Sequence, residues 1–364
     1  MRSSSLVFVV ALVSGCSASH DSPVDANVDS PAAMPFAEGV KRCASDADCN
    51  AAWPVCRCDA RCWGSPGSGP AEHGPTPRTV TYVIGGLRIV EGASSASAFG
   101  LDLDATTGGP SGLCTGAMDF TSPISGDPGV DNQLQAFLRY GENAGAHPNY
   151  GEPAGSIGGS TLDVISSGMR GWFIEVSDID SLEDDCLVNI RLGVLGGAIA
   201  LGTACTSHED ETSCHADARN ACLWSPSMSE CRGIASGQTA RILAVSGMGT
   251  GRIGGGVLRS GPIGQTQIEL AAGEGGAVAT QIYDTRIEAR IDEAALTTGQ
   301  LGGWVEMLNL QTFASFLSIG GGPRFTAESL EAQVRPDLAP DASGHCTRVS
   351  AGFAFDALAI NIVP

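Results

Sequence analysis

Residues 286–291, Arg-Ile-Glu-Ala-Arg-Ile, alternate charged and apolar side chains without interruption. Successive side chains of a β-strand point to opposite faces, so a period of two predicts a strand that is buried on one face only. Ile287, Ala289 and Ile291 would face a core, and the three charged residues between them would face solvent. This stretch favours a sheet with one apolar side as the basis of the fold.

Apolar and β-branched runs predict further strands on both sides of this one. They cover 79–90, 99–103, 172–176, 187–194, 238–245, 267–271, 278–282 and 349–362. Helical spacing is rarer, and it predicts helices at 130–138, capped by Asp131 or Asn132, at 162–169 and at 304–317. We therefore expect a mainly β chain: an antiparallel, jelly-roll-like β-sandwich with a few short helices and small disulfide-rich modules.

Composition limits the kind of partner that the chain can have. It has 364 residues, of which 43% are hydrophobic and 49 are glycine, and its formal net charge is −20. No run of lysine and arginine interrupts this acidity, so phosphate backbones and anionic lipid surfaces would repel the chain. We expect no nucleic-acid partner.

The N-terminus has the pattern of a secretory signal. Arg2 precedes a short apolar run at 6–13, and small residues lead to Leu12-Val13-Ser14-Gly15-Cys16. The segment resembles the bacterial lipoprotein signal, which is cut before a cysteine that then carries acyl chains such as palmitate. This resemblance implies that Cys16 is lipidated and that the protein lies outside the cytoplasm, attached to a membrane. In the alternative, an ordinary signal peptide, Cys16 has no special role.

Ser17 resembles the residue that directs such lipoproteins to the outer membrane. Composition then divides the chain into a signal peptide at 1–15, a flexible Asp/Pro/Ser tether at 16–39 and a small cysteine-rich module at 40–64. A Gly/Pro linker follows at 65–78, and the sandwich body occupies 79–364 with a cysteine-rich insertion at 205–231.

Thirteen cysteines are present, and setting Cys16 aside leaves an even number. In an exported chain this predicts disulfides rather than a metal site. The residues expected to form them are Cys43, Cys49, Cys56, Cys58, Cys62, Cys114, Cys186, Cys205, Cys214, Cys222, Cys231 and Cys346. The insertion would hold two internal bridges, while the pairing itself stays open. The opening of the first module resembles small cysteine-rich modules of secreted proteins, including the Dickkopf N-terminal type.

Further signatures lie in the body. They are residues 126–134, the strand at Trp172 followed by Asp184-Asp185, and the glycine-led segment 302–317. Together with the signal and tether, they resemble uncharacterised envelope lipoproteins of myxobacteria and related deltaproteobacteria. The resemblance implies a location and an architecture, but no activity.

Motifs for enzymatic chemistry are weak. Residues 249–254, Gly-Thr-Gly-Arg-Ile-Gly, match the dinucleotide-binding pattern, but glycines follow where a helix is required, so we interpret them as a Gly-rich loop. Neither Gly-x-Ser-x-Gly nor His-Glu-x-x-His occurs in the sequence. His208 and His215 flank Cys214 without zinc-type spacing, which favours a solvated pair. We assign no catalytic residue.

Two acidic turns are the candidate metal sites. One contains Asp178, Asp180, Asp184 and Asp185, and the other contains Asp127 and Asp131. Dense carboxylates can supply the oxygen ligands that a structural Ca²⁺ prefers, although neither turn follows the EF-hand spacing. Solvated turns explain the same runs without a metal. We expect no other cofactor.

These observations favour a surface-anchored lipoprotein of the bacterial envelope without catalytic activity. It would bind an envelope protein or a glycan, or serve as a structural component. The alternative is a secreted-type hydrolase that acts on glycan or peptide through acidic loop residues. A cleft with two facing carboxylates would favour the enzyme.

Overall fold

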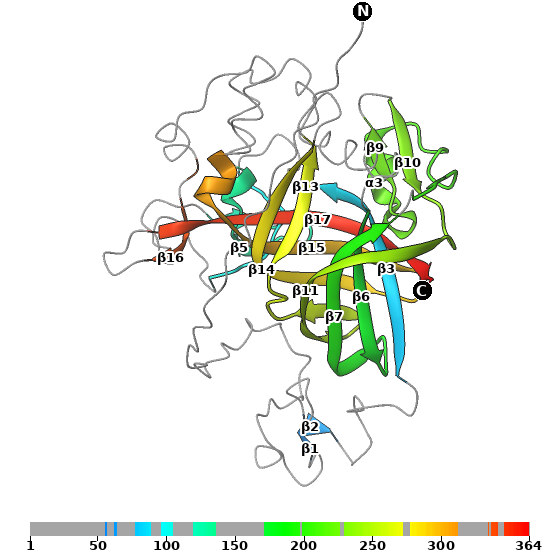
Figure 1. Cartoon of the computed structure of the whole chain (residues 1–364), viewed down its shortest axis with the longest axis horizontal. Coiled ribbons are helices and arrows are strands. Elements are labelled where there is room, and N and C mark those ends of the chain that lie inside the picture. Colours follow the sequence, from blue (N-terminus) through cyan, green and yellow to red (C-terminus); the bar gives the residue numbers. More distant parts are fainter. Residues whose placement is uncertain are drawn as a thin grey trace, which may run out of the picture. The chain divides into compact units, whose positions relative to one another are not determined.

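The computed structural model of the protein describes twelve parts of the chain (Figure 1). These are residues 55–56, 62–63, 77–88, 96–104, 119–135, 171–196, 199–225, 229–271, 277–311, 334, 336–340 and 346–363. The chain divides into Met1–Pro35 and Phe36–Pro364, and all described residues belong to the second unit. The predicted signal, Cys16, the tether and the helix at 162–169 lie outside the described residues.

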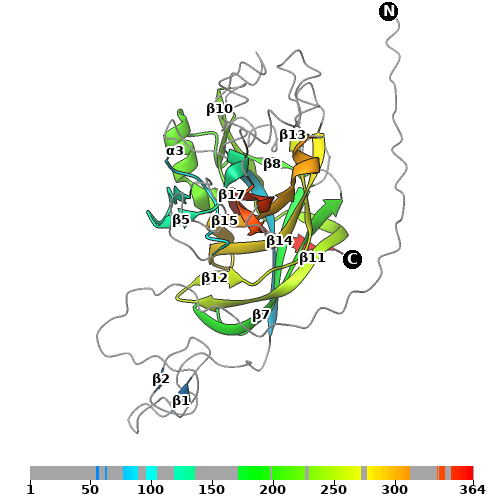
Figure 2. The same ribbon diagram turned by 90° about the vertical axis from the view of Figure 1, so that its left-hand side faces the viewer.

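The main sheet closes on itself through antiparallel strand pairs, with one additional parallel pairing between Thr239–Ala240 and Asn361–Ile362. Its eight strands are β12 (Val257–Ser260), β11 (Thr239–Gly254), β7 (Asp184–Gly196), β6 (Gly171–Ile179), β3 (Arg78–Arg88), β17 (Cys346–Ile362), β15 (Ala295–Glu306) and β14 (Ala277–Ile291). Each pairs with the next in this order, and β14 pairs with β12 to complete the ring. Figures 1 and 2 show the strands curving around a common interior.

Short strands accompany this ring. They are β13 (Thr266–Ala271) beside β14, β16 (Leu338–Pro340) beside β17, the pair β4 (Phe120–Thr121) and β5 (Pro128–Val130), and the pair β1 (Val55–Cys56) and β2 (Cys62–Trp63). The mainly β, antiparallel class is thus confirmed, but the predicted sandwich is replaced by an eight-stranded barrel. A half-buried strand alternates in the same way in both architectures, so alternation alone could not separate them.

The interior of the ring is apolar. The stretch 286–291 behaves as predicted, because Ile287, Ala289 and Ile291 are buried while the charged residues between them are half exposed or exposed. On β17 the same alternation sends Phe353 and Phe355 into the core. Fully burying one such side chain contributes about 1.5–3 kcal/mol.

The cysteine-rich insertion covers part of the outer wall. In the structure the insertion extends beyond the predicted 205–231 and runs from β8 (Leu201–Gly202) through α3 (Glu211–Ala216), the 3-10 helix η2 (Ala218–Asn220) and β9 (Leu223–Ser225) to β10 (Glu230–Ile234). Ala221 and Ile234 of the insertion pack in one buried cluster with Val83 and Phe173. The side chains of Val83 and Phe173 point outward from the ring. Gly85 permits this approach, since a Cβ there would lie 2.9 Å from the Cβ of Ala221.

Several predicted elements differ from the structure. The helix expected at 304–317 is wrong at its start, because Trp304–Glu306 end β15 and pair with β17, and the described helical residues are 307–311. β15 was not predicted because it is rich in glycine. One of these glycines, Gly299, makes room for an aromatic ring: a Cβ there would lie 2.6 Å from the ring of Phe355.

Two glycine-rich or alternating segments were also misassigned. Residues 249–254 form the last part of strand β11 instead of a loop, and the chain turns at Gly255 and Gly256, both with positive φ. Residues 99–103 form no strand; Leu101 and Leu103 lie over Gly302 on the outer face of β15. The predicted cap is confirmed for Asn132, whose Oδ1 accepts a hydrogen bond from the Gln135 amide at 3.1 Å.

Candidate functional site

In the acidic turn between β6 and β7, carboxylates accept hydrogen bonds from nearby backbone amides. Asp185 is buried, and its two oxygens accept hydrogen bonds from the amides of Asp180 at 2.6 Å and Leu187 at 3.1 Å. Asp184 Oδ1 accepts from the Gly255 amide at 3.0 Å and thereby holds the β11–β12 turn. Asp178 has positive φ and accepts from the side chain of Asn189. These hydrogen bonds account for the acidic residues as turn formers.

Among the described residues, three groups of possible ligands have their ligand atoms within 4.8 Å of one another, and none includes a residue of that turn. Of the six aspartates predicted to bind calcium, only Asp131 belongs to such a group, with Asp102 and Asp104. Asp127 lies apart in an exposed turn. Asp102 and Asp104 alternate with leucines, a pattern that indicates a strand and gives no sign that they lie near Asp131.

Residues 99–104 lie on the outer face of β15 and β17 and are called the covering segment below. Asp131 lies between this segment and the sheet. The side chain is 2% exposed, and Oδ2 accepts hydrogen bonds from the amides of Leu103 at 2.6 Å and Asp104 at 3.2 Å. Burial raises the pKa of Asp131 to about 8; the amide of Leu103 opposes the shift, while the charges of Asp104, Asp337 and Asp119 add to it.

A second buried carboxyl, Asp337, belongs to the same neighbourhood. It lies on the approach to β16, and burial raises its pKa to about 7, although hydrogen bonds from Ser350 act in the opposite direction. Nothing in the local sequence distinguishes Asp337 from a solvated turn residue. Asp131 and Asp337 therefore form the centre of a buried acidic cluster that takes up protons near neutral pH.

Asn132 fixes this cluster on the outer face of β17. Its amide nitrogen donates to the carbonyl oxygens of Phe99 at 2.6 Å and Gly352 at 3.0 Å. The neighbouring Gln133 amide donates to the hydroxyl of Ser350 at 2.9 Å. The segments 99–104 and 131–135 are thus bound to the wall through polar contacts, and the carboxylates lie at their junction.

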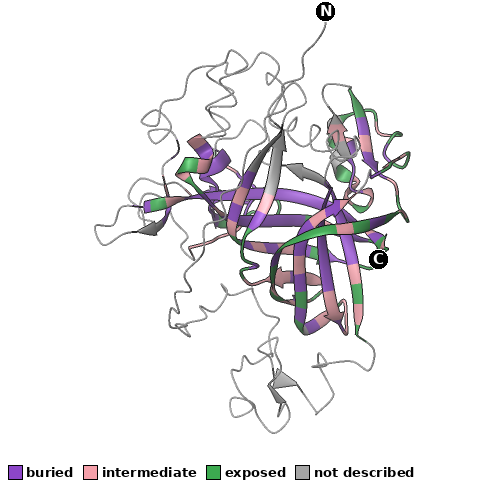
Figure 3. Ribbon diagram, in the orientation of Figure 1, coloured by how far each residue is buried: buried purple, intermediate pink, exposed green. Residues whose placement is uncertain are grey.

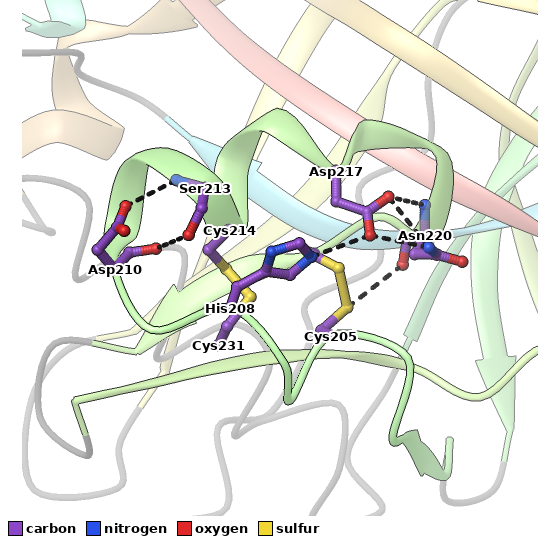
Figure 4. The surroundings of a disulfide bond; sticks show 9 residues. Cys205, His208, Asp210, Ser213, Cys214, Asp217, Asn220 and Cys231 are labelled. Atoms are coloured by element: carbon purple, nitrogen blue, oxygen red, sulfur yellow. Dashed lines mark hydrogen bonds and ion pairs between the residues drawn. A yellow bond between two sulfur atoms is a disulfide. The ribbon is translucent and has the colours of Figure 1, made fainter.

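The insertion contains two disulfides, as predicted: Cys205–Cys222 and Cys214–Cys231 (Figure 4). Cys346 is also disulfide-bonded. The side chains of the other cysteines predicted to form disulfides lie outside the described residues.

Metal binding in the insertion has little support. Two of the three ligand groups lie here, but both include cysteines that already form disulfides. His208 Nε2 lies 3.0 Å from Asp217 Oδ2 and is half buried, while the side chain of His215 lies outside the described residues. Burial acts to raise the pKa of Asp217, but hydrogen bonds from Asn220 and His208 outweigh it and lower the pKa.

Comparisons with known proteins give no relative. No family model matches the chain, and neither a curated protein nor a solved structure is significantly similar to it. In the described part of the chain, no helix is both long enough and apolar enough to cross a membrane.

Proposed function

We propose that the protein is a non-catalytic binding component of a bacterial cell envelope, anchored to the outer membrane through acyl chains on Cys16. The observation that carries this proposal is the pair of disulfides in the insertion, Cys205–Cys222 and Cys214–Cys231. Disulfides of this kind persist in oxidising compartments and are rare in the cytosol. They agree with the secretory pattern at 1–15 and with its lipoprotein-like cysteine.

The described carboxyl groups favour binding over hydrolysis. A general acid must reach the proton acceptor on its substrate. Asp131 and Asp337 have pKa values suited to proton transfer, but they are 2% and 4% exposed, and their oxygens are engaged by backbone amides and by Ser350. Their raised pKa values follow from burial within the structure and give the hydrolase alternative no support.

The packing of the ring also suits a binding protein that uses its outer surface. The core of the ring consists of packed apolar side chains, so ligands are expected on the outer surface. The insertion adds a rigid module to one part of that surface. The partner is a protein or a glycan of the envelope, and nucleic acid is not expected.

The test of the anchor is substitution of its cysteine. Cys16→Ser should move the protein from the membrane fraction to the soluble fraction, while Ser17→Ala, which keeps Cys16, should stay with membranes. Sedimentation of Cys16→Ser with membranes would contradict lipidation.

Compartment and activity need separate measurements. Alkylation without reductant should leave the four insertion cysteines unmodified, and modification of all four would refute export into an oxidising compartment. Turnover of envelope polysaccharide or peptide by the purified protein would contradict the non-catalytic role.

A further inference from the structure

Four arginines from three neighbouring strands share the outer face of the ring. They are Arg252 on β11, Arg259 on β12, and Arg286 and Arg290 on β14. Their chain neighbours belong to the interior core: Ile253, Leu258, Ile287, Ala289 and Ile291. Because side chains alternate along a strand, the arginines point outward. The sequence contains no basic run, so the register of the strands creates this cluster.

The register places like charges opposite one another. Arg252 is the cross-strand partner of Arg259, which is in turn the partner of Glu288. Like charges that lie directly opposite each other on two strands are destabilising. Glu288 holds Arg259 in a two-point ion pair, with Nε–Oε2 at 3.0 Å and Nη2–Oε1 at 3.2 Å. This pair engages Arg259 and leaves the charge of Arg252 beside it.

Three of the four guanidinium groups have no such compensation. Within the described chain, no carboxylate lies at ion-pair distance from Arg252, Arg286 or Arg290. This positive face belongs to a protein whose formal net charge is −20. Arg290 is exposed and Arg252 and Arg286 are half buried, so solvent reaches all three; the exposed residues of β11 in Figure 3 lie before Arg252. The charge of this face is complementary to that of an anion.

An aromatic pair continues the same outer face along β14 and β15. The rings of Tyr283 and Trp304 are stacked, with centroids 4.3 Å apart and planes inclined by 16°. The guanidinium of Arg348 on β17 lies 3.9 Å from the centroid of the Trp304 ring. Trp304 Nε1 donates to Asp284 Oδ2 at 2.8 Å, which fixes the ring. Tyr283 and Arg348 therefore cover the two faces of Trp304, and the outer face of the half-buried Tyr283 ring is left to contact an apolar surface of a ligand.

We propose that the outer face of β11, β12 and β14 binds an acidic polysaccharide whose carboxylates contact Arg252, Arg286 and Arg290. The Arg259–Glu288 pair shows the two-point geometry that a guanidinium offers to a carboxylate. The arginines extend over three strands, roughly 10 Å across, so a chain of repeated charges fits them better than a single small ion. The outer face of Tyr283 packs against a sugar ring, and Trp304 supports Tyr283 from behind. This deepens the proposed function, because it names the glycan that an envelope protein would bind.

The test measures binding of the full-length protein in detergent to polygalacturonate. Wild type should bind with an affinity that falls as salt rises, while neutral dextran should not bind. Arg252→Gln, Arg286→Gln and Arg290→Gln combined should weaken binding at least tenfold. The slope of log K against log salt should become shallower by about 2, since each neutralised charge contributes about 0.7 for a single-stranded polyanion.

Arg219→Gln is the matched control. Arg219 is exposed, lies on η2 of the insertion, and loses the same charge on substitution. It should bind like wild type. Absence of binding by the wild type, equal loss in the control, an unchanged affinity of the triple variant, or tighter binding to an oligonucleotide or an anionic vesicle would each overturn the proposal. If the triple variant does not fold, the single variants Arg252→Gln and Arg290→Gln should each weaken binding, and unchanged affinity in both would overturn it.

Failure of this proposal is distinguishable from failure of the anchor. Cys16→Ser should bind polygalacturonate as tightly as wild type, because the arginine face does not include the N-terminus. If the wild-type protein sediments with membranes but does not bind polygalacturonate, the glycan site alone is refuted.

Discussion

The carboxylate of Asp337 accepts two hydrogen bonds from Ser350, one from the backbone amide at 2.8 Å and one from the hydroxyl. Both residues are buried, and the same hydroxyl accepts a hydrogen bond from the Gln133 amide at 2.9 Å. Three segments distant in sequence therefore meet at one serine on the outer face of β17. Ser350 thereby joins the segment around Gln133 and the segment around Asp337 to strand β17.

Ser350→Ala should destabilise the fold by about 1–3 kcal/mol. The substitution leaves a buried carboxyl oxygen and a buried amide without their partner, and such groups keep the full cost of desolvation. Urea unfolding measures the change. Ser236→Ala, in an exposed turn, should alter stability by less than about 0.5 kcal/mol, and equal effects of the two substitutions would contradict the role of Ser350.

Stability should fall as pH rises from about 4 to 8. Burial raises the pKa of Asp337 to about 7 and of Asp131 to about 8, whereas an unfolded aspartate titrates near 3.9. The folded state therefore binds more protons than the unfolded state in this window, and its advantage is lost as pH rises through the folded values.

Asp131→Asn should make this pH dependence shallower. The amide oxygen can still accept from Leu103 and Asp104, and the side chain no longer ionises. Unfolding in urea at pH 5, 7 and 9 should show the variant gaining stability relative to wild type as pH rises. Asp127→Asn, in an exposed turn, should follow the wild-type curve. Identical curves for Asp131→Asn and wild type would show that this carboxyl does not control stability.

Gly352→Ala should disturb the contact between the covering segment and β17. A Cβ at Gly352 would lie 2.2 Å from the carbonyl oxygen of Phe99 and 2.6 Å from the Cα of Gly100. Relieving such overlaps costs about 1–3 kcal/mol. Gly254→Ala is the control, since nothing lies within 4 Å of its Cβ position. A thermal midpoint as high for Gly352→Ala as for Gly254→Ala would mean that the covering segment does not lie on β17.

The two disulfides of the insertion should stabilise it equally. Each joins cysteines 17 residues apart, which corresponds to about 3 kcal/mol of loop-closure entropy in the unfolded chain. Replacing Cys205 and Cys222 by alanine should therefore cost as much as replacing Cys214 and Cys231. Guanidinium unfolding of the two double variants measures this, and peptide mapping without reductant should recover the two cross-linked pairs. Recovery of Cys205 linked to Cys214 would contradict the pairing.

The sequence was sufficient for the strands whose pattern is local. Alternation at 286–291 and the apolar runs before and after 180–185 indicated β14, β6 and β7 correctly. β15 was overlooked because its glycines give no hydrophobic signal, and they are needed only because Phe355 and Ile282 approach them from neighbouring strands. Closure of the ring likewise depends on the long-range pairing of Leu258 with Ala289.

The same distinction applies to the candidate sites. The two bridges of the insertion could be predicted because their four cysteines are close in sequence. The acidic cluster could not, since Asp131 and Asp337 are 206 residues apart and meet only on the outer face of β17. The arginine face escaped notice for the same reason: alternation spaces its residues along each strand, and pairing brings them together.

Pairing of β12 with β14 also determines how other molecules can approach this one. Each strand of the described ring has a neighbour on both sides, and the edges that a foreign peptide could still extend include β13, which pairs only with β14, and the part of β11 before Gly251, which β12 does not cover. Elsewhere around the ring, partners must be recognised by side chains on the outer surface. The same closure shortens the free strand edges from which edge-to-edge aggregation starts.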